Sequence, residues 1–186
     1  MAKDSNGSNG GNGSNGGGGH ARRMRLDAPP AGGERALEAV DVLREFLEAD
    51  GWHPEQFEES QLFRMHCQGQ NATFSCYAQV RVELDQVLFY AVCPVRVAEA
   101  NRLAVAEFLT RANYGMRIGN FEMDFDDGEV RYKTSLDFEG HALTFGMVRG
   151  LVYPAVQTLD AYLPGLLAVS HGDKTPLEAI RAIEEE

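Results

Sequence analysis

The side chains most often used for catalysis or metal binding here are five histidines and three cysteines: His20, His53, His66, His141, His171, Cys67, Cys76 and Cys93. No histidine shares a predicted helix or strand with another histidine, a cysteine or a carboxylate at a metal-ligand spacing. His66 and Cys67 are adjacent, but neighbouring strand residues point to opposite faces, and no third group would orient such a pair. The sequence therefore predicts no catalytic residue, no metal site, no cofactor and no enzymatic activity.

The cysteines are odd in number and include no CxxC pair. Each lies inside an apolar strand pattern, so we interpret all three as small core residues rather than redox groups.

The acidic run from Asp124 to Glu129 resembles a calcium-binding loop at first sight. It lacks the twelve-residue frame and the terminal bidentate glutamate of such loops. Asp and Gly are typical of tight turns, so we interpret the run as a solvated hairpin turn. The segment Gly115 to Gly119 lacks the glycine spacing and the GK[ST] ending of a phosphate loop, and we expect it to join a helix to a strand.

Residues 1–35 differ in composition from the rest of the chain. They hold 10 of the 20 glycines, in runs with Asn and Ser, and almost no side chain that could fill a core. Such a segment cannot bury enough apolar surface to offset the entropy lost on ordering, so we predict a disordered tail. Residues 36–186 then form one domain that is long enough for a core of its own.

The formal charge divides at the same boundary. The tail carries a net +2 and the whole chain −11, which leaves −13 on the domain. An acidic domain repels phosphate backbones, so we expect no nucleic-acid partner. The basic cluster Arg22-Arg23-Met24-Arg25 could contact an anion, although such clusters are more often solubilising ends of linkers.

The N-terminal residues are polar and glycine-rich where a signal peptide would be apolar. No run of the sequence approaches the 18 apolar residues of a membrane-spanning helix. We therefore expect a cytoplasmic protein without a membrane partner.

Apolar periodicity predicts the order of elements in the domain. They are helices over 34–50 and 97–113, strands over 61–68, 72–84 and 87–94, a hairpin over 121–137 and a long helix from Thr144. Pro154 should kink or divide this long helix, and Pro164-Gly165 should interrupt it again. Thr175, Pro176 and Glu178 mark the start of a last helix.

This α-βββ-α-ββ-α order predicts an α+β fold in which helices pack on an antiparallel sheet, with a C-terminal helical extension. The strand over 87–94 is apolar on both faces, so we expect it to be central. Helices would cover one of its faces, and a partner chain could cover the other.

Surplus apolar surface on this strand and on the long helix is either core or an interface. Interfaces favour Met and aromatic side chains, so the plausible partner-binding residues are Met65, Phe89, Tyr90, Tyr153 and Tyr162. A protein-binding module is the favoured interpretation. The alternative is a small-molecule-sensing regulatory domain, with a pocket between the long helix and the sheet and hinges at Pro154 and Pro164.

Two segments of the chain, NYGMRIGNFEMDFDDGEVRYKTSLDFEG and VQTLDAYLPGLLAVSHGDKTPLEAI, resemble the YbjN family of bacterial sensory transduction regulators. The resemblance covers residues 36–186, and the hairpin and the YLPG segment are its most specific parts. It implies a fold similar to type III secretion chaperones, which are small, acidic, dimeric proteins that bind protein segments. It therefore implies a chaperone-like or regulatory homodimer with a protein or peptide partner and no catalytic residues.

Overall fold

The computed structural model describes residues 34–57 and 61–185, so the predicted tail over residues 1–35 falls almost wholly outside the described part. The helices are α1 (Glu34–Ala49), α2 (Arg102–Asn113), α3 (Phe145–His171) and α4 (Pro176–Glu184), with short 3₁₀ helices at Val82–Leu84 and Glu99–Asn101. The strands are β1 (Glu55–Gln56), β2 (Leu62–Gln68), β3 (Thr73–Arg81), β4 (Gln86–Arg96), β5 (Asn120–Met123) and β6 (Glu129–Asp137).

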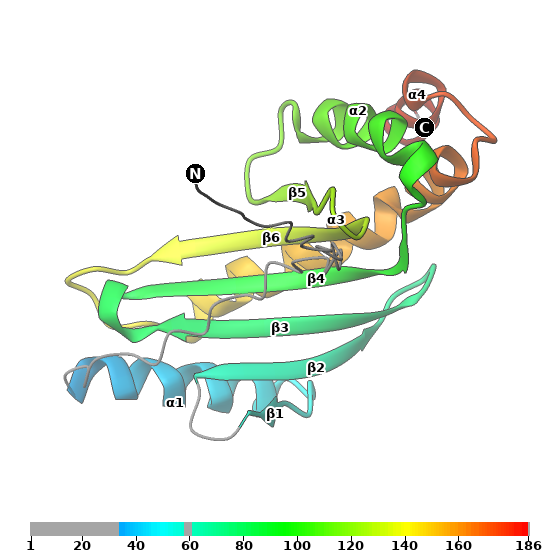
Figure 1. The fold of residues 1–186 in the computed structure, drawn as a ribbon. Coiled ribbons are helices and arrows are strands. Elements are labelled where there is room, and N and C mark those ends of the chain that lie inside the picture. Colours follow the sequence, from blue (N-terminus) through cyan, green and yellow to red (C-terminus); the bar gives the residue numbers. More distant parts are fainter. Residues whose placement is uncertain (1–33, 58–60, 186) are drawn as a thin grey trace, which may run out of the picture.

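The six strands form one antiparallel sheet in the order β1-β2-β3-β4-β6-β5 (Figure 1). β4 is central and pairs with β3 on one side and β6 on the other, as its apolar pattern predicted. β1 was not predicted, because two residues are too short to show the period-two alternation of a strand. The predicted α+β fold with an antiparallel sheet is confirmed.

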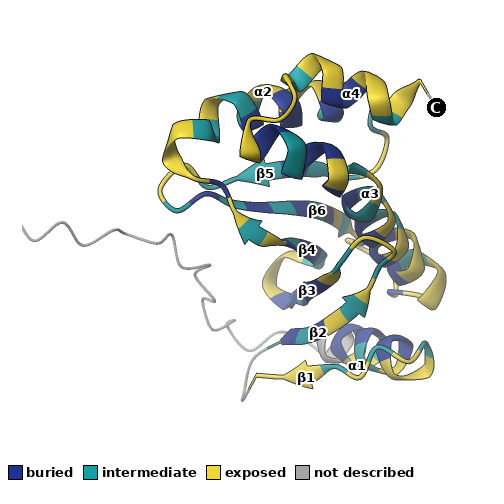
Figure 2. Ribbon diagram, turned by 90° about the vertical axis from the view of Figure 1, so that its right-hand side faces the viewer, coloured by how far each residue is buried: buried dark blue, intermediate teal, exposed yellow. Residues whose placement is uncertain are grey.

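The pleat of the strands gives the sheet two different faces. One row of paired residues, formed by Phe63, Ala78, Phe89 and Thr134, is fully buried. α1 and α3 lie over this helix-covered face (Figure 1), and the buried residues gather between the layers (Figure 2). Thr134 is polar, but its hydroxyl donates a hydrogen bond of 3.0 Å to the carbonyl of Leu151 in α3, so its burial leaves no unpaired group.

α3 is a single helix, so Pro154 does not divide it, and our prediction that Pro164-Gly165 interrupts it is wrong. A proline inside a helix costs about 3 kcal/mol, because it removes a hydrogen bond and crowds the preceding turn. The apolar face of α3 packs on the sheet and, towards its C-terminal end, on α2 and α4, and this burial offsets that cost. It includes Leu151, Val152, Ala155, Leu159, Leu163 and Leu166. The helix ends as predicted at Gly172, whose φ is +80°.

The predicted start of α4 and the predicted hairpin turn are confirmed. The backbone N–H of Glu178 donates to Thr175 Oγ1, and the Glu178 carboxylate accepts from the Thr175 N–H, which is a complete capping box. Gly128 in the β5–β6 turn has a φ of +76°, and a Cβ there would lie 2.1 Å from the carbonyl oxygen of Val97. A glycine at this position lets the hairpin approach the end of β4 closely.

β5 lies at one edge of the sheet, and a side chain of α2 closes its outer side. Asn113 Oδ1 accepts a hydrogen bond of 2.7 Å from the backbone N–H of Phe121, and Asn113 Nδ2 donates one of 3.1 Å to the Phe121 carbonyl. This amide takes the place of a neighbouring strand and blocks edge-to-edge pairing at Phe121. The broad face of the sheet is therefore more available to a partner than this edge.

Candidate functional site

The face of the sheet opposite α1 and α3 is crossed by no described helix (Figure 1). On this uncovered face, β4 presents Leu88, Tyr90 and Val92 in a line, with Tyr77 of β3 paired beside Tyr90. Leu88 and Val92 are half-buried. The apolar second face that the sequence predicted for this strand is thus directed to the uncovered side of the sheet.

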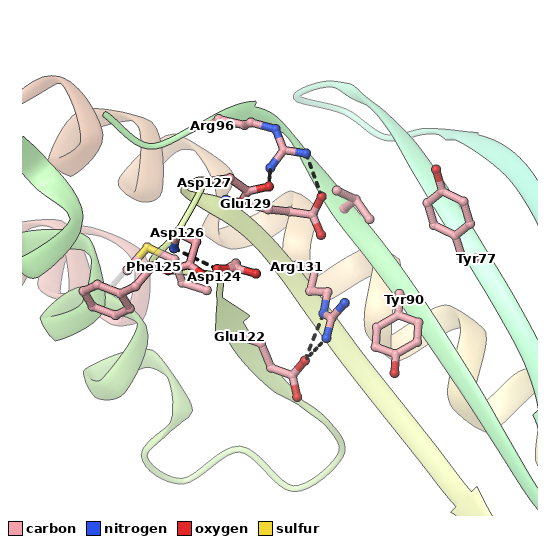
Figure 3. A pocket seen from close by; sticks show the side chains of 12 residues that line it. Tyr77, Tyr90, Arg96, Glu122, Asp124, Phe125, Asp126, Asp127, Glu129 and Arg131 are labelled. Atoms are coloured by element: carbon pink, nitrogen blue, oxygen red, sulfur yellow. Dashed lines mark hydrogen bonds and ion pairs between the residues drawn. The ribbon is translucent and has the colours of Figure 1, made fainter. Parts of the chain in front are cut away.

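A hollow of about 910 Å³ lies between β4 and the β5–β6 hairpin (Figure 3). We call it the hairpin hollow. Its apolar lining consists of Tyr77, Tyr90, Val92, Met123 and Phe125, and its charged lining of Arg96, Glu122, Asp124, Asp126, Asp127, Glu129 and Arg131. The hollow therefore combines an apolar floor with a charged rim.

Glu122 of β5 connects two cations of β6 on one side of this rim. The distance from Glu122 Oε2 to Arg131 Nη2 is 2.8 Å, and that from Oε1 to Lys133 Nζ is 2.5 Å. The Arg131 guanidinium also lies over the ring of Tyr90, 4.5 Å from its centroid. Burial alone would raise the pKa of Glu122, but the hydrogen bonds and charges of Lys133 and Arg131 outweigh it and hold that pKa below its ordinary value.

A second set of ion pairs joins the end of β4 to the start of β6. Arg96 Nη1 lies 2.5 Å from Asp127 Oδ2, and its Nη2 lies 3.0 Å from Glu129 Oε2. Backbone hydrogen bonds reinforce this join, since the Val97 N–H donates to the Gly128 carbonyl at 2.9 Å. The hairpin turn is thus fixed against β4, and the hollow between them has a defined shape.

The turn of the hairpin carries two carboxylates, Asp124 and Asp126, that differ from Glu122 in their partners. Asp124 Oδ1 accepts a hydrogen bond of 2.8 Å from the backbone N–H of Asp126. Neither Asp124 nor Asp126 forms an ion pair within the described part of the chain. Phe125 lies between them and is 51% exposed.

Phe125 is not among the predicted partner-binding residues. Its alternation with Asp124 and Asp126 continues that of Phe121 and Met123, which is the pattern of a strand. In the structure β5 ends at Met123, so Phe125 belongs to the turn at the edge of the hollow, and its ring is directed away from Tyr90 and Arg131 (Figure 3). The sequence signal for such a binding residue was a large apolar side chain between two aspartates in a turn. A ring in a turn stays exposed, and an exposed ring is available to a partner.

Of the five predicted partner-binding residues, Tyr90 is the one that lines the hairpin hollow. Burial raises its pKa above the ordinary value, against the opposing charges of Arg131 and Lys133. Met65 and Phe89 are on the helix-covered face, where they are 1% and 0% exposed and contact the core. The structure therefore does not bring these residues together on one surface.

The other two predicted residues form hydrogen bonds within the chain. The Tyr153 hydroxyl donates to Asp50 Oδ2 at 2.8 Å, and the Tyr162 hydroxyl donates to Glu184 Oε1 at 2.8 Å. Tyr153 thereby ties α3 to the end of α1, and Tyr162 ties α3 to α4. Both tyrosines lie on α3, away from the hairpin hollow.

Groups that would carry chemistry are buried or dispersed in the described residues. Burial raises the pKa of the thiols of Cys67, Cys76 and Cys93, which disfavours the thiolate form that attacks substrates. No group of three or more His, Cys, Asp or Glu side chains in residues 34–57 and 61–185 could hold a metal ion. The helices of this same part of the chain include none that is long and apolar enough to span a bilayer.

Comparison with known proteins identifies the family of this chain. The model of the YbjN family, described as "Putative bacterial sensory transduction regulator", matches residues 39–168. A crystal structure described as "YbjN, a putative transcription regulator from E. coli" shares the fold, with a TM-score of 0.52 and 17% sequence identity over 71% of this chain and 92% of that one. A search of curated proteins found no significant match. Because the family model spans most of the chain, including the sheet, the hairpin hollow and nearly all of α3, the protein belongs to the YbjN family.

Proposed function

We propose that this protein is a non-enzymatic regulatory module that binds a segment of a partner protein in the hairpin hollow. The observation that carries the proposal is the apolar line of Leu88, Tyr90 and Val92 on the uncovered face of the central strand. A strand that is apolar on both faces is typical of a sheet that is covered on both sides. In the described part of the chain, helices cover one side alone, and a partner segment would cover the other.

The lining of the hollow supports a protein segment as the occupant. Its volume of about 910 Å³ is enough for several side chains. Aromatic side chains and Met in its floor, with charges at its rim, match the composition of protein interfaces. A bound segment would place apolar side chains against Tyr90, Val92 and Phe125, and its cations near Asp124 and Asp126.

The alternative function, a small-molecule sensor, required a pocket between α3 and the sheet. Leu151, Ala155 and Leu159 of α3 are buried against the sheet at that position. The hairpin hollow lies on the opposite face and is shaped by a hairpin rather than by the prolines of α3. A protein segment is therefore the occupant that we propose, and homodimerisation stays a prediction for light scattering to test.

The proposal can be tested with two matched substitutions in the full chain. Phe125→Ala removes a ring from the hollow, and Phe145→Ala removes one that is 44% exposed at the start of α3. The full chain serves as bait in native extract. We expect Phe125→Ala to lower the affinity for the bound partner about tenfold or more, as the loss of an aromatic anchor does. Phe145→Ala should retain it, and equal capture by both variants would contradict the proposed site.

A further inference from the structure

The outer side of β2 is only partly covered by its neighbour at the edge of the sheet. β2 has seven residues, and β1, the edge strand beside it, pairs with two of them (Figure 1). The register of this pairing, with Glu55 opposite Arg64, would bring His53 opposite His66. His53 instead has a φ of +49°, a left-handed conformation that is uncommon outside glycine, and it turns the chain off the edge. The second half of β2 is therefore itself an edge of the sheet.

This part of β2 directs backbone hydrogen-bonding groups outward. The Leu62 carbonyl accepts a hydrogen bond of 3.1 Å from the Phe57 N–H, which lies on the outer side. Backbone groups of an antiparallel strand alternate between its two sides, so the N–H and C=O groups of His66 and Gln68 also point outward. No described residue forms a hydrogen bond with these outward groups, and both residues are exposed.

Residues 65–68 carry none of the features that usually keep an exposed edge from pairing. Such edges are blunted by lysine, by proline or by a bulge. The sequence here is Met-His-Cys-Gln, and the pairing of β2 with β3 runs through these residues without a register shift. The β5 edge, by contrast, is closed by the side chain of Asn113. The open stretch of β2 is thus a regular strand without a neighbour among the described residues.

The geometry of this edge defines the ligand that would fit it. Outward groups two residues apart repeat about every 6.7 Å along a strand, and an extended backbone repeats its own groups at the same spacing. Cys67 is directed to the helix-covered face, where it is half-buried against the core, whereas His66 and Gln68 are directed to the other face. An added strand would therefore place an apolar side chain beside Cys67, between two polar ones.

We propose that the edge of β2 at His66 and Gln68 binds an extended peptide segment of a second protein, which adds a strand to the sheet. The segment would form about four backbone hydrogen bonds with these two residues. Its paired residues would alternate polar, apolar and polar. The hairpin hollow lies between β4 and the β5–β6 hairpin, so this site is separate from it and does not rest on the proposed function.

Peptide selection followed by amide exchange tests the inference on the full chain. Random dodecapeptides displayed on phage are selected on the immobilised protein, and the tightest binder is synthesised. Hydrogen exchange, read by NMR with and without this peptide, should slow about tenfold or more at the amides of His66 and Gln68. The amide of Cys67 points to β3 and should change little, so it is the internal control.

N-methylation of the peptide provides the matched comparison in an unchanged protein. A methyl group on a peptide amide that donates to β2 removes a hydrogen bond and prevents close approach, so it should lower the affinity about tenfold. A methyl group on the next amide, which points away from β2, should change the affinity by less than about twofold. An effect that alternates in this way is the signature of an added strand.

Three results would overturn the inference: protection of other amides without His66 and Gln68, equal effects of N-methylation at successive positions, or a library that yields no binder. Failure here is distinguishable from failure of the proposed function. A peptide that protects His66 and retains its affinity for the Phe125→Ala variant supports the edge site alone. If every selected peptide loses affinity with Phe125→Ala and leaves exchange at His66 unchanged, the hairpin hollow binds peptides and the β2 edge does not.

Discussion

At the scale of single residues, Glu122 organises the charged wall of the hairpin hollow. Its two carboxylate oxygens pair with different cations, and one of these, Arg131, covers the ring of Tyr90. Removal of the carboxylate charge would leave Arg131 and Lys133 side by side without their shared partner. Such a pair of cations repels, and the desolvation of Arg131 over the ring would no longer be offset.

Glu122→Gln should therefore lower the free energy of unfolding by about 1–2 kcal/mol at pH 7. The pKa of Glu122 is below its ordinary value in the folded protein, so its charge stabilises the fold above the unfolded-state pKa. That contribution is lost as the pH falls through the lowered pKa, so the difference in unfolding free energy between wild type and variant should be smaller at pH 3 than at pH 7. Urea unfolding at the two pH values measures this difference.

Glu107→Gln is the control for this prediction. Glu107 pairs with Arg111 at 2.7 Å on the exposed side of α2, and a helical pair of this kind contributes about 0.5 kcal/mol or less. A cost for Glu122→Gln that stays the same at pH 3 would mean that the shape of the side chain matters there and its charge does not.

At the scale of elements, the β2–β3 turn is held by α3. Asp160 of α3 accepts hydrogen bonds from the backbone N–H groups of Gln70 at 2.8 Å and Asn71 at 2.9 Å. Gly69 allows this approach, because a Cβ there would lie 2.5 Å from Asp160 Oδ1 and 2.6 Å from the ring of Phe74. The turn, the strand β3 and the helix α3 are thus fixed as one unit.

Gly69→Ala should destabilise the protein by about 2 kcal/mol or more, since the new methyl group forces the turn away from Asp160. Gly150→Ala is the matched substitution. Gly150 is exposed in α3, and a Cβ there meets no atom within 4 Å, so the alanine should stabilise the helix by about 0.5–1 kcal/mol. Thermal unfolding of the two variants checks the opposite signs, and similar shifts for both would contradict this account of the turn.

Most elements could be predicted from the sequence because their local signals agree with their packing. The alternation of Phe74, Cys76, Ala78 and Val80 places β3 on the core, and these residues are all buried. Local signals failed where tertiary burial overrides them, as at Pro154, or where an element is as short as β1. The site was predicted in part: Tyr90 followed from a strand that is apolar on both faces, but the place of Phe125 depends on where β5 ends, which no local pattern fixes.

At the scale of the whole molecule, the layers make the two faces of one sheet unequal. α1 and α3 cover one face with apolar side chains, whereas the other carries ion pairs around the apolar line of β4 and the hairpin hollow. The closed edge at β5 leaves this face as the broad surface for association. The partner segment that we propose would lie on this surface.

The most direct test of this account is a site-specific cross-link to the partner. The full chain would carry p-benzoylphenylalanine at position 125 in one sample and at position 145 in another, both irradiated in native extract. The account predicts one dominant protein cross-linked through position 125, in the hairpin hollow, and not through position 145. The same products from both positions, or a specific product from position 145 alone, would contradict it.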